Sequence, residues 1–474
     1  MILALMIVYH SVRPLWLKNS TLLIASYAFY ASFTPAYAIL LFIITAATYV
    51  FAWVLKKADG QKYQRAVLSI VIAATLLPLL YFKYRNFVGE NVNWLLPQML
   101  RISTSDVLFP VGLSFFTFNI LTYLIDCSRG RLNVQHSFRD YALYVSFFPS
   151  ILAGPLLRPS DFLFQLKNKI ELQGALIWEG LVLITLGFFK KLVVADNLSL
   201  IANPIFSQPE KFSGPELLMG AYVFTVQIYC DFSGYTDIAR GVARLFGLQL
   251  PINFNFPYLA KDPSDFWGRW HISLSSWFRD YLYIPLGGNR RGTLRTVQNL
   301  FLVMFLCGLW HGASWHFVAW GIYHGVLLIL YRYFDVLMSK LAPVTGTLEP
   351  AQNNRFIDSA RHALSVFIMF HFIVAGWILF KADSLQIAMN YFKGITTLSS
   401  YKTASQALTH QYILACLAVL AFSIYHAFSS SLKFKETVLR LRFNPYVSSA
   451  LVLMVLVIIA LKVDQNVQFI YFRF

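Results

Sequence analysis

Long charge-free intervals run through the chain and predict membrane-spanning helices. No charge occurs from Asn19 to Leu55, 37 residues that as one helix would measure about 55 Å, well beyond a hydrocarbon core of roughly 30 Å. A break is therefore expected at Thr34-Pro35, because proline interrupts helix hydrogen bonding. The 36 charge-free residues from Thr296 to Tyr331 likewise predict two elements. Other spans are expected near residues 20–33, 36–55, 66–82, 107–125, 174–189, 217–230, 363–380, 411–430 and 445–461.

Basic residues between these intervals orient the predicted spans. Lys and Arg are enriched in cytoplasmic loops, which places residues 56–65, the region around Arg131 and the long loop 240–298 in the cytoplasm. Arg158 then belongs to the same side as Arg131, although residues 141–157 between them are apolar. A re-entrant element at 141–157, which contains two prolines, satisfies both requirements. Such a backbone is tolerated at membrane depth where it packs within protein.

Composition narrows the class of protein. Of 474 residues, 57% are hydrophobic and 13% charged, against about 25% charged in a typical soluble domain, and the mean hydropathy is +0.57. These values exclude a soluble enzyme, a disordered chain, a secreted disulfide scaffold and a coiled coil. The sequence predicts an all-α polytopic membrane protein of roughly 11–13 membrane-embedded helices, re-entrant elements included. Without internal repeats or long linkers, residues 1–474 are expected to form a single membrane domain.

The charge balance and the cysteines add little chemistry. The net charge of +17 comes without a long basic run, so it is attributed to cytoplasmic loops and no nucleic-acid partner is expected. The cysteines are far apart and are interpreted as buried free thiols: Cys127, Cys230, Cys307 and Cys416. His316 and His324 each lie about 140° around a helix from His311, and no H-E-x-x-H motif is present. No metal site is therefore predicted.

His311 is an isolated polar residue within a long uncharged segment. It lies 16 residues from the nearest charge, Arg295, which is about 24 Å along a helix and deep within a membrane. A polar side chain there either has a function or hydrogen-bonds a neighbouring helix. Gly308 and Gly312 flank it at a spacing that lets another helix approach closely.

The stretch around His271 has two interpretations. Trp267, Trp270 and Trp277 surround this histidine, which is typical of an amphipathic helix at the membrane interface with an incidental histidine. Alternatively, His271 is a second polar residue that lines a path to His311. Upstream, Asp231 and Asp237 are compatible with paired structural carboxylates, and downstream Gly287, Gly288 and Asn289 predict a turn.

Several motifs succeed one another in an order typical of one protein family. They are Phe109-Pro-Val-Gly-Leu-Ser-Phe-Phe-Thr-Phe118, Ala153-Gly-Pro155, Asp231-Phe-Ser-Gly-Tyr-Thr-Asp237, Asn253-Phe-Asn-Phe-Pro-Tyr258, Phe266-Trp267 through Gly288-Asn289, and Gly308-Leu-Trp-His-Gly-Ala-Ser314. With these motifs the chain resembles the membrane-bound O-acyltransferase family, in the bacterial branch that acetylates exopolysaccharides. The resemblance covers most of the chain and is densest over residues 107–331, the expected catalytic core.

The resemblance implies a reaction and a location. Members transfer an acyl group, most often acetyl, from a cytoplasmic thioester donor to a hydroxyl outside, through a funnel-shaped helical core with a tunnel near the histidine. The donor is acetyl-CoA or an acyl carrier protein, and no bound cofactor is implied. The acceptor is alginate, cellulose, peptidoglycan or teichoic acid, often with a periplasmic acetyltransferase partner. We therefore expect a multi-pass protein of the bacterial inner membrane, in contact with membrane lipid and a polysaccharide acceptor.

The same resemblance assigns His311 as the catalytic histidine and His271 as the second family histidine. A buried imidazole stays neutral and can accept a proton from the acceptor hydroxyl. His271, Asn253 or Trp310 is expected to donate to the forming oxyanion, and the sequence does not choose among them. Asp231 and Asp237 are expected to orient the site.

Three arginines suggest how an anionic donor is recruited. Arg290, Arg291 and Arg295 cluster in the predicted cytoplasmic loop, where they either attract the donor or only anchor the topology. A competing class of function is a transporter or export subunit in which His311 relays protons. The absence of an inverted repeat counts against a transporter.

Overall fold

The structure, a computed structural model, consists of helices over the part of the chain that it describes. It describes residues 2–57, 60–104, 109–132, 137–168, 174–341, 355–397 and 401, with 446, 449–450, 453 and 457. The α-helices are α1 (Ile2–Ser11), α2 (Leu15–Ala31), α3 (Pro35–Lys57), α4 (Gln61–Leu79), α5 (Arg85–Val92), α6 (Leu113–Ser128), α7 (Phe138–Ser146), α8 (Pro159–Lys167), α9 (Gly174–Phe188), α10 (Asp196–Ser207), α11 (Gly214–Leu245), α12 (Pro263–Trp267), α13 (Ile272–Phe278), α14 (Thr293–His311), α15 (Trp315–Leu341), α16 (Arg355–Lys381) and α17 (Leu385–Thr396).

Short helices of other types complete the list. The π-helices are η1 (Leu80–Tyr84), η3 (Phe189–Ala195) and η6 (Arg279–Tyr283), and the 3-10 helices are η2 (Gln98–Leu100), η4 (Pro209–Lys211) and η5 (Pro257–Leu259). Among the described residues, extended pairing is limited to an isolated bridge between Phe254 and Trp270. The predicted all-α class is confirmed.

Within the described part of the chain, five helices are long and apolar enough to cross a membrane, which confirms a polytopic membrane protein. They are Pro35–Lys57, Lys62–Val92, Thr293–His311, Trp315–Lys340 and Ile357–Lys381. The predicted break at Thr34-Pro35 is confirmed, because α3 begins at Pro35, where the missing N–H of proline is not needed. The interval 296–331 divides into two helices as expected. The expected spans at 411–430 and 445–461 lie outside the described residues.

Two predicted spans have different limits. Helix α6 starts at Leu113 rather than near 107, because Gly112 adopts a left-handed conformation with φ 82° and prevents an earlier start. Helix α11 is 32 residues long, whereas the sequence predicted a span only at 217–230. The polar residues that follow position 230 stay helical because Asp231 and Asp237 each find a basic partner.

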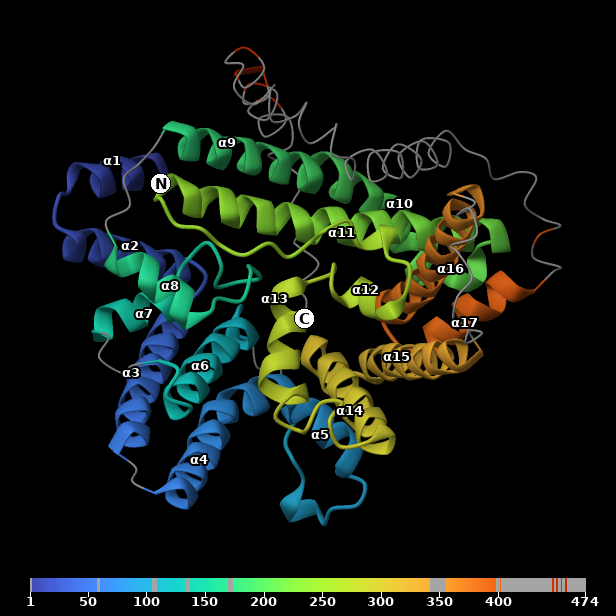
Figure 1. The fold of residues 1–474 in the computed structure, drawn as a ribbon, viewed down its shortest axis with the longest axis horizontal. Helices are drawn as coiled ribbons and strands as arrows, with labels where there is room; N and C mark the ends of the chain where they lie inside the picture. Colours follow the sequence, from blue (N-terminus) through green and yellow to red (C-terminus); the bar gives the residue numbers. More distant parts are fainter. Residues whose placement is uncertain are drawn as a thin grey trace, which may run out of the picture. The chain divides into compact units, whose positions relative to one another are not determined.

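The described chain forms two compact units. Unit 1 comprises the described residues of Met1–Phe188, Gly234–Ile252 and Ser448–Phe474, and unit 2 those of Phe189–Ser233 and Asn253–Val447. Within unit 1, α9 lies along the second half of α11 (Figure 1). Gly180 meets the backbone of Gly241, and Gly187 meets that of Gly234, so a side chain at any of these glycines would collide. The single domain over 1–474 stays a prediction.

The predicted re-entrant segment of unit 1 is not a continuous span. Helix α7 has nine residues, about 14 Å, and residues 147–157 continue as buried turns. Backbone N–H groups of these turns donate hydrogen bonds to side chains of the protein. The N–H of Phe148 donates to Ser26 Oγ at 3.2 Å, and the N–H of Leu157 donates to Asn119 Oδ1 at 3.1 Å. This is the condition under which irregular backbone is tolerated at membrane depth. The side on which its two ends emerge stays a prediction.

That prediction is tested by labelling exposed positions at both ends. Single cysteines at Ser137 and Ser160, in a variant without the native cysteines, are expected to react with a membrane-impermeant maleimide from the same side, because the basic residues on both flanks favour the cytoplasm. Labelling in intact cells and in inverted vesicles measures the side. Reaction from opposite sides would mean that 141–157 crosses the membrane.

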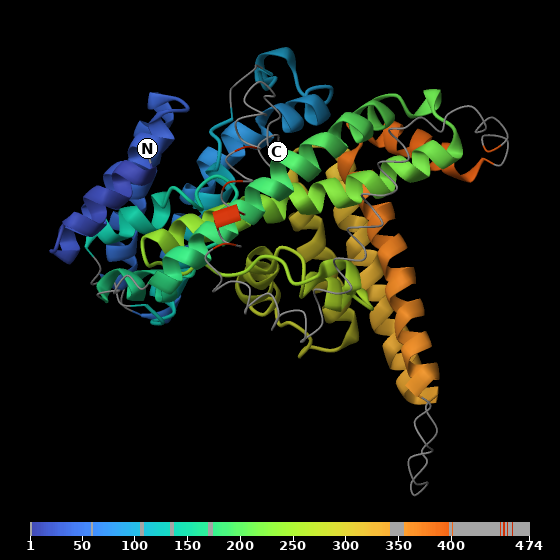
Figure 2. The same cartoon turned by 90° about the horizontal axis from the view of Figure 1, so that it is seen from above.

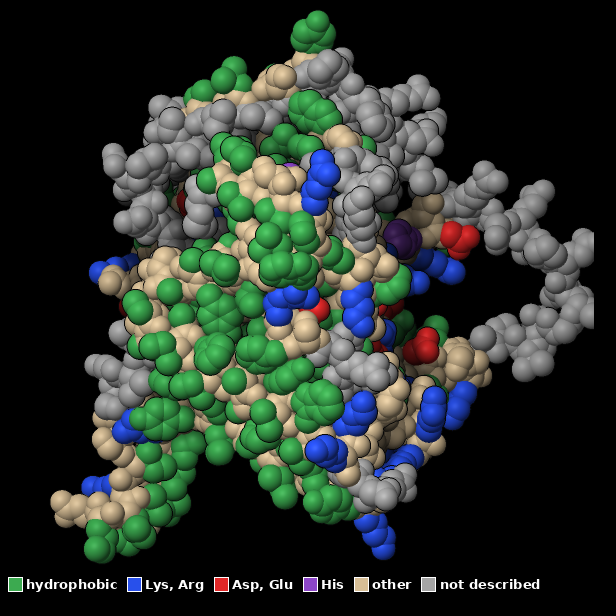
Figure 3. Space-filling view, turned by 90° about the vertical axis from the view of Figure 1, so that its left-hand side faces the viewer, with side chains coloured by type: hydrophobic (Ala, Val, Ile, Leu, Met, Phe, Trp, Pro, Cys, Tyr) green, Lys and Arg blue, Asp and Glu red, His purple; other side chains and the backbone are tan. Residues whose placement is uncertain are grey.

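The surface carries the apolar side chains expected of a protein in lipid. In unit 1, α3 exposes Ile39, Phe42 and Ile43, each at least half accessible. The space-filling view shows a broad apolar area, with most of the visible Lys and Arg side chains in the right half (Figure 3). Such an area would be unusual on a soluble monomer and suits contact with acyl chains. The protein is accordingly a multi-pass membrane protein.

Unit 2 is organised by a helix hairpin and a third long helix. Helices α14 and α15 are antiparallel neighbours, and α15 packs along α16 as the pair of orange helices in Figure 2. Gly308 lies against the backbone of Gly321, and a Cβ on Gly308 would collide with the carbonyl oxygen of Phe317. The predicted close approach of another helix at Gly308 is therefore confirmed.

Candidate active site

His311 is the last residue of α14, where the hairpin turns. Arg295 lies 16 residues before His311 and Arg332 lies 21 residues after it, with no charge between them, so the turn is about 24 Å or more along either helix from a charged residue. The imidazole is 3% exposed. A Cβ on the neighbouring Gly312 would enter the ring of Phe317. The tight turn therefore holds His311 at the buried end of the hairpin.

Aromatic rings enclose the His311 imidazole. Its centroid lies 4.9 Å from that of Trp310, 4.9 Å from that of Trp320 on α15 and 5.2 Å from that of Phe380 on α16. All three contacts are edge-to-face, the arrangement that ring quadrupoles favour. Three helices thus fix the orientation of the imidazole in an apolar enclosure.

The loop segment Asn253–Asn255 anchors His271. The backbone C=O of Asn253 accepts from the N–H of Ile272 at 3.0 Å, and its Oδ1 accepts from the N–H of Ser273 at 3.1 Å. The N–H of Asn255 donates to the C=O of Arg269 at 3.0 Å. These hydrogen bonds fix the first turn of α13. They connect the motif at 253–258 with the backbone on both sides of His271.

His271 itself has a strained backbone. Its φ of 43° is left-handed, a conformation that costs a non-glycine residue about 1–3 kcal/mol and often marks a functional site. The side chain is 1% exposed and Trp270 is equally buried. The alternative of one continuous amphipathic helix at the interface is therefore wrong, because the helix breaks at His271 and its tryptophan is internal. Burial lowers the pKa of His271 to about 3, so the imidazole is neutral at physiological pH.

Trp310 brings the two histidines to one site. Its ring centroid lies 6.2 Å from that of His271 and 4.9 Å from that of His311. Phe232 packs edge-on against the other side of His271 at 4.7 Å. The structure thus places four of the predicted site residues close together: Trp310 contacts His271 and His311, and Asn253 holds the backbone next to His271.

The two aspartates of the 231–237 motif are not paired with each other. Asp231 is buried and accepts from Lys191 Nζ at 2.7 Å. Asp237 lies in unit 1, where Arg240 Nη1 is 3.4 Å from its carboxylate. Asp231 precedes Phe232 and so reaches the site through its neighbour.

The three predicted recruitment arginines lie at the opposite end of α14 from His311. Arg290, Arg291 and Arg295 are all exposed, next to a turn in which Gly287, Gly288 and Gly292 have positive φ, as the turn prediction expected. Arg295 is 16 residues before His311, about 24 Å along the helix. The arginines do not join the histidines; they lie at the other end of the hairpin.

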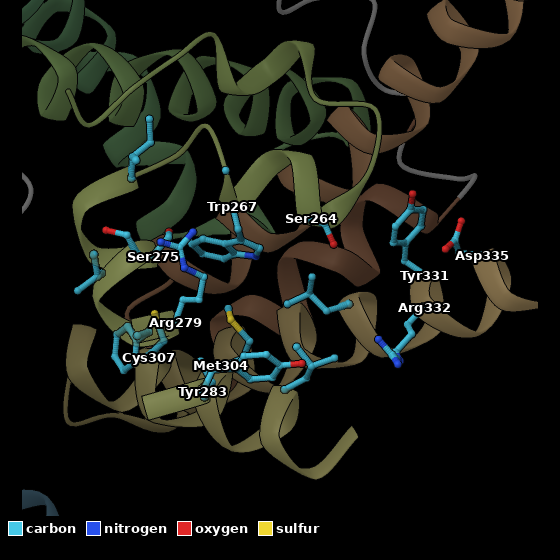
Figure 4. Close-up of a pocket in the computed structure, with 18 residues that line it drawn as sticks. Ser264, Trp267, Ser275, Arg279, Tyr283, Met304, Cys307, Tyr331, Arg332 and Asp335 are labelled. Carbon is cyan, nitrogen blue, oxygen red and sulfur yellow. The ribbon is translucent and has the colours of Figure 1, made fainter. Parts of the chain in front are cut away.

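A cavity of about 510 Å³ occupies unit 2 between α13, α14 and α15 (Figure 4). Its middle is apolar, with Val303 and Met304 of α14 and Leu328 of α15 in the wall. Arg279 lies at one end and Arg332 at the other, as Figure 4 shows. This volume falls within the roughly 300–1,000 Å³ of small-molecule sites.

The cavity approaches the histidines through their neighbours. Ile272 follows His271 directly, and Cys307 precedes His311 by one helical turn; both line the cavity, and the histidines do not. Trp267 and Cys307 of this cavity stand out in the sequence, but nothing there predicts the cavity itself. The four-residue spacing of Cys307 and His311 could have placed both on one face of α14, but nothing in the sequence joins Arg279 to Arg332. No group of three metal-ligating side chains occurs over the residues that the structure describes.

Comparison with known proteins identifies the family of the chain. Residues 26–373 match the profile described as "MBOAT, membrane-bound O-acyltransferase family". The "Probable alginate O-acetylase AlgI" of Pseudomonas aeruginosa is 36% identical over 393 residues, which cover 81% of this chain and 71% of that protein. The "Peptidoglycan O-acetyltransferase" of Helicobacter pylori is 34% identical over 404 residues, covering 80% and 73%.

A more distant relative transfers a different acyl group. The "Teichoic acid D-alanyltransferase" of Bacillus subtilis is 29% identical over 323 residues, covering 65% of this chain and 76% of that protein. Both His271 and His311 lie within the residues that match the profile. The chain therefore belongs to the membrane-bound O-acyltransferase family, and it is a membrane-bound O-acyltransferase.

Proposed function

We propose that this enzyme transfers an acyl group, in the first instance acetyl, from a cytoplasmic thioester donor to hydroxyls of an exported polysaccharide at the bacterial inner membrane. The observation that carries the proposal is the contact of Trp310 with both buried imidazoles, beside a cavity with an arginine at each end. Two relatives whose printed names give an acetylated polysaccharide, alginate and peptidoglycan, support acetyl as the group and a polysaccharide as the acceptor.

The cavity suits the thioester arm of the donor. Its apolar middle accommodates a flexible chain, and Arg279 and Arg332 offer charge and hydrogen bonds to phosphate. The Nε of Arg332 is buried and, among the described residues, has no hydrogen-bond partner, so it is available to a ligand. CoA and the prosthetic arm of an acyl carrier protein share this chemistry.

His311 acts as the general base. Its neutral imidazole takes the proton of the acceptor hydroxyl while the oxygen bonds to the thioester carbonyl carbon. The C–S bond then breaks, and the imidazolium returns the proton to the leaving thiolate. An ester and a free thiol result, so charge and atoms balance without a cofactor.

The oxyanion that forms between these steps needs a hydrogen-bond donor. His271 is neutral and rigidly held, so its N–H is suited to this role. The Nδ2 of Asn253 is buried and lacks a hydrogen-bond partner within the described ranges, which makes it a second donor. Trp310 fills the space between the imidazoles and keeps water out.

The acceptor is either the polysaccharide hydroxyl itself or a serine of a periplasmic partner that passes the acyl group on. Deletion of the gene and complementation in the native bacterium test the function. Loss of ester-linked acetyl groups from otherwise normal exported polysaccharide, restored by the wild-type gene, is the expected result. Loss of the polysaccharide itself would favour the export-subunit alternative, and an unchanged acetyl content would contradict acyl transfer to this acceptor.

The exposed arginines next to the hairpin yield a kinetic prediction. Replacing Arg290, Arg291 and Arg295 with glutamine is expected to raise the KM for the anionic donor and flatten its salt dependence, because charge attraction raises local donor concentration and is screened by salt. The kcat should change little, since the arginines lie about 24 Å from His311.

Initial rates at low and high salt measure this effect. The matched control replaces Lys56, Lys57 and Lys62, three basic residues of another predicted cytoplasmic loop, and should leave the donor KM unchanged. An unaltered KM at low salt in the arginine variant, with correctly inserted protein, would limit these arginines to anchoring the topology.

A further inference from the structure

We infer that Lys191 is a positioning residue for acyl transfer: its buried ion triad with Asp231 and Asp196 holds α11 in the register that packs Phe232 against His271. The inference rests on the role proposed for His271. It follows from contacts that lie within unit 2, and two members of the triad, Lys191 and Asp196, had no role in the sequence analysis.

The triad is compact and buried. Lys191 Nζ lies 2.7 Å from Asp231 Oδ1 and 2.9 Å from Asp196 Oδ1, and the three side chains are at most 5% exposed. Lys191 comes from η3, Asp196 from the first residue of α10 and Asp231 from the middle of α11. The ammonium of Lys191 thus joins two helices, and removing it alone would leave two buried carboxylates without their counter-charge, which is costly.

A neighbouring lysine holds the same helix. Lys190 Nζ lies over the ring of Tyr229 at 5.8 Å from its centroid. Consecutive lysines of η3 therefore contact α11 at positions 229 and 231, on either side of Cys230. The π-helical turn that presents them interrupts an otherwise α-helical segment, and such turns are frequent at functional sites.

From α11 the contacts continue to the histidine turn. Phe232 lies 4.7 Å from His271 and 5.1 Å from Phe254, centroid to centroid. Tyr229 lies 5.5 Å from Phe254 and 6.5 Å from Trp270. Both residues of the bridge, Phe254 and Trp270, therefore pack against α11, the helix that Lys190 and Lys191 contact.

The physical role differs from simple stabilisation. A buried ion pair contributes little more to stability than apolar residues of the same volume, because desolvation of the charges offsets their attraction. The ion pair does fix the relative position of the helices that carry it, because the ammonium must lie at hydrogen-bond distance from its carboxylates. A rotation of α11 that moved Phe232 off His271 would break the contact with Asp231, so the triad selects one register.

The test neutralises the triad without leaving a buried charge. The triple variant Lys191→Met, Asp196→Asn and Asp231→Asn retains volume, and it is expected to insert with a Tm near that of the wild type. We expect kcat to fall between about tenfold and a hundredfold, as for a small misplacement of a reacting group, with the donor KM unchanged. Phe232→Leu, which keeps the triad, should lower kcat to a similar extent.

Non-additivity distinguishes positioning from general loosening. If the triad acts through Phe232, the combined variant should be no slower than the slower of its two components. The matched control, Glu179→Gln with Arg244→Gln, removes an ion pair that also joins α11 to the segment of α9, but in unit 1; it should leave kcat unchanged.

His271→Ala is assayed alongside, so that failure of the proposed function can be recognised. Wild-type activity in His271→Ala would overturn the role of His271 itself. An impaired His271→Ala enzyme together with wild-type kcat in the triple variant would overturn the positioning role alone. If the triple variant does not insert into the membrane, Phe232→Leu becomes the test. A wild-type kcat in Phe232→Leu would show that the contact of Phe232 with His271 does not affect catalysis and would overturn the positioning role.

Discussion

Replacing His311 with alanine is expected to lower the rate of acyl transfer by about 10²–10⁴-fold, the usual contribution of a general base. The imidazole lies at the buried end of the α14–α15 hairpin, and no titratable side chain is among the rings that enclose it: Trp310, Trp320 and Phe380. The acceptor hydroxyl would thus lose its base while the helix packing at Gly308 is retained. Ester-linked acetyl content of the exported polysaccharide, at matched protein level, measures the effect.

A second histidine of unit 2 provides the control for this variant. His371 on α16 is partly buried and its Nε2 lies 2.9 Å from the hydroxyl of Tyr222. His371→Gln keeps a polar partner for this tyrosine and should retain wild-type acetylation. Wild-type acetylation in His311→Ala would remove His311 from the mechanism and would favour an assembly role for the protein.

Replacing His271 with alanine is expected to lower kcat by about 10²–10³-fold, as removal of one donor from an oxyanion hole does in other enzymes. The effect should fall on kcat rather than on the donor KM, because the oxyanion exists only in the transition state. Single-turnover rates with purified protein separate the two parameters. If kcat fell by less than about threefold, His271 would have only a packing role, because a hydrogen-bond donor to the oxyanion contributes far more than that to kcat.

Two further features of His271 sharpen that measurement. Glutamine at this position keeps an N–H donor, so His271→Gln should recover part of the activity that His271→Ala loses. Burial lowers the pKa of His271 to about 3, so its neutral form prevails at every pH above that value and its titration should be absent from the pH profile between pH 5 and 8. A limb of the wild-type profile in that range that disappears in His271→Gln would contradict a neutral donor.

The architecture near His311 could be predicted because it depends on residues that are close to one another in the sequence. An uncharged interval of 36 residues demanded a reversal, and the reversal occurs immediately after His311. Gly308 predicted a close helix contact and makes one with Gly321. The break before Pro35 follows from the chemistry of a single residue. For the two long uncharged intervals, the thickness of the membrane limits the length of one helix and therefore requires a break.

The remainder of the site depends on contacts between distant residues. Asn253 caps the helix that follows His271, and Lys191 meets Asp231 across 40 positions. Neither pair shares a periodicity or a motif that a single sequence displays. The Trp-rich stretch suggested an interfacial helix because tryptophan suits both a membrane boundary and a protein core, and only the burial of Trp270 decides between them.

The most direct test of acyl transfer through His311 uses the purified full-length protein in lipid nanodiscs. Acetyl-CoA and an acetylated acyl carrier protein serve as donors, each with an isotopic label in the acetyl group, and a short oligosaccharide of the native polymer serves as acceptor. We expect one donor to release its thiol in step with the appearance of labelled ester, and both signals to fall to background in His311→Ala. Thiol release and ester formation at wild-type rates in His311→Ala, or no thiol release from either donor by the wild-type protein, would contradict this expectation.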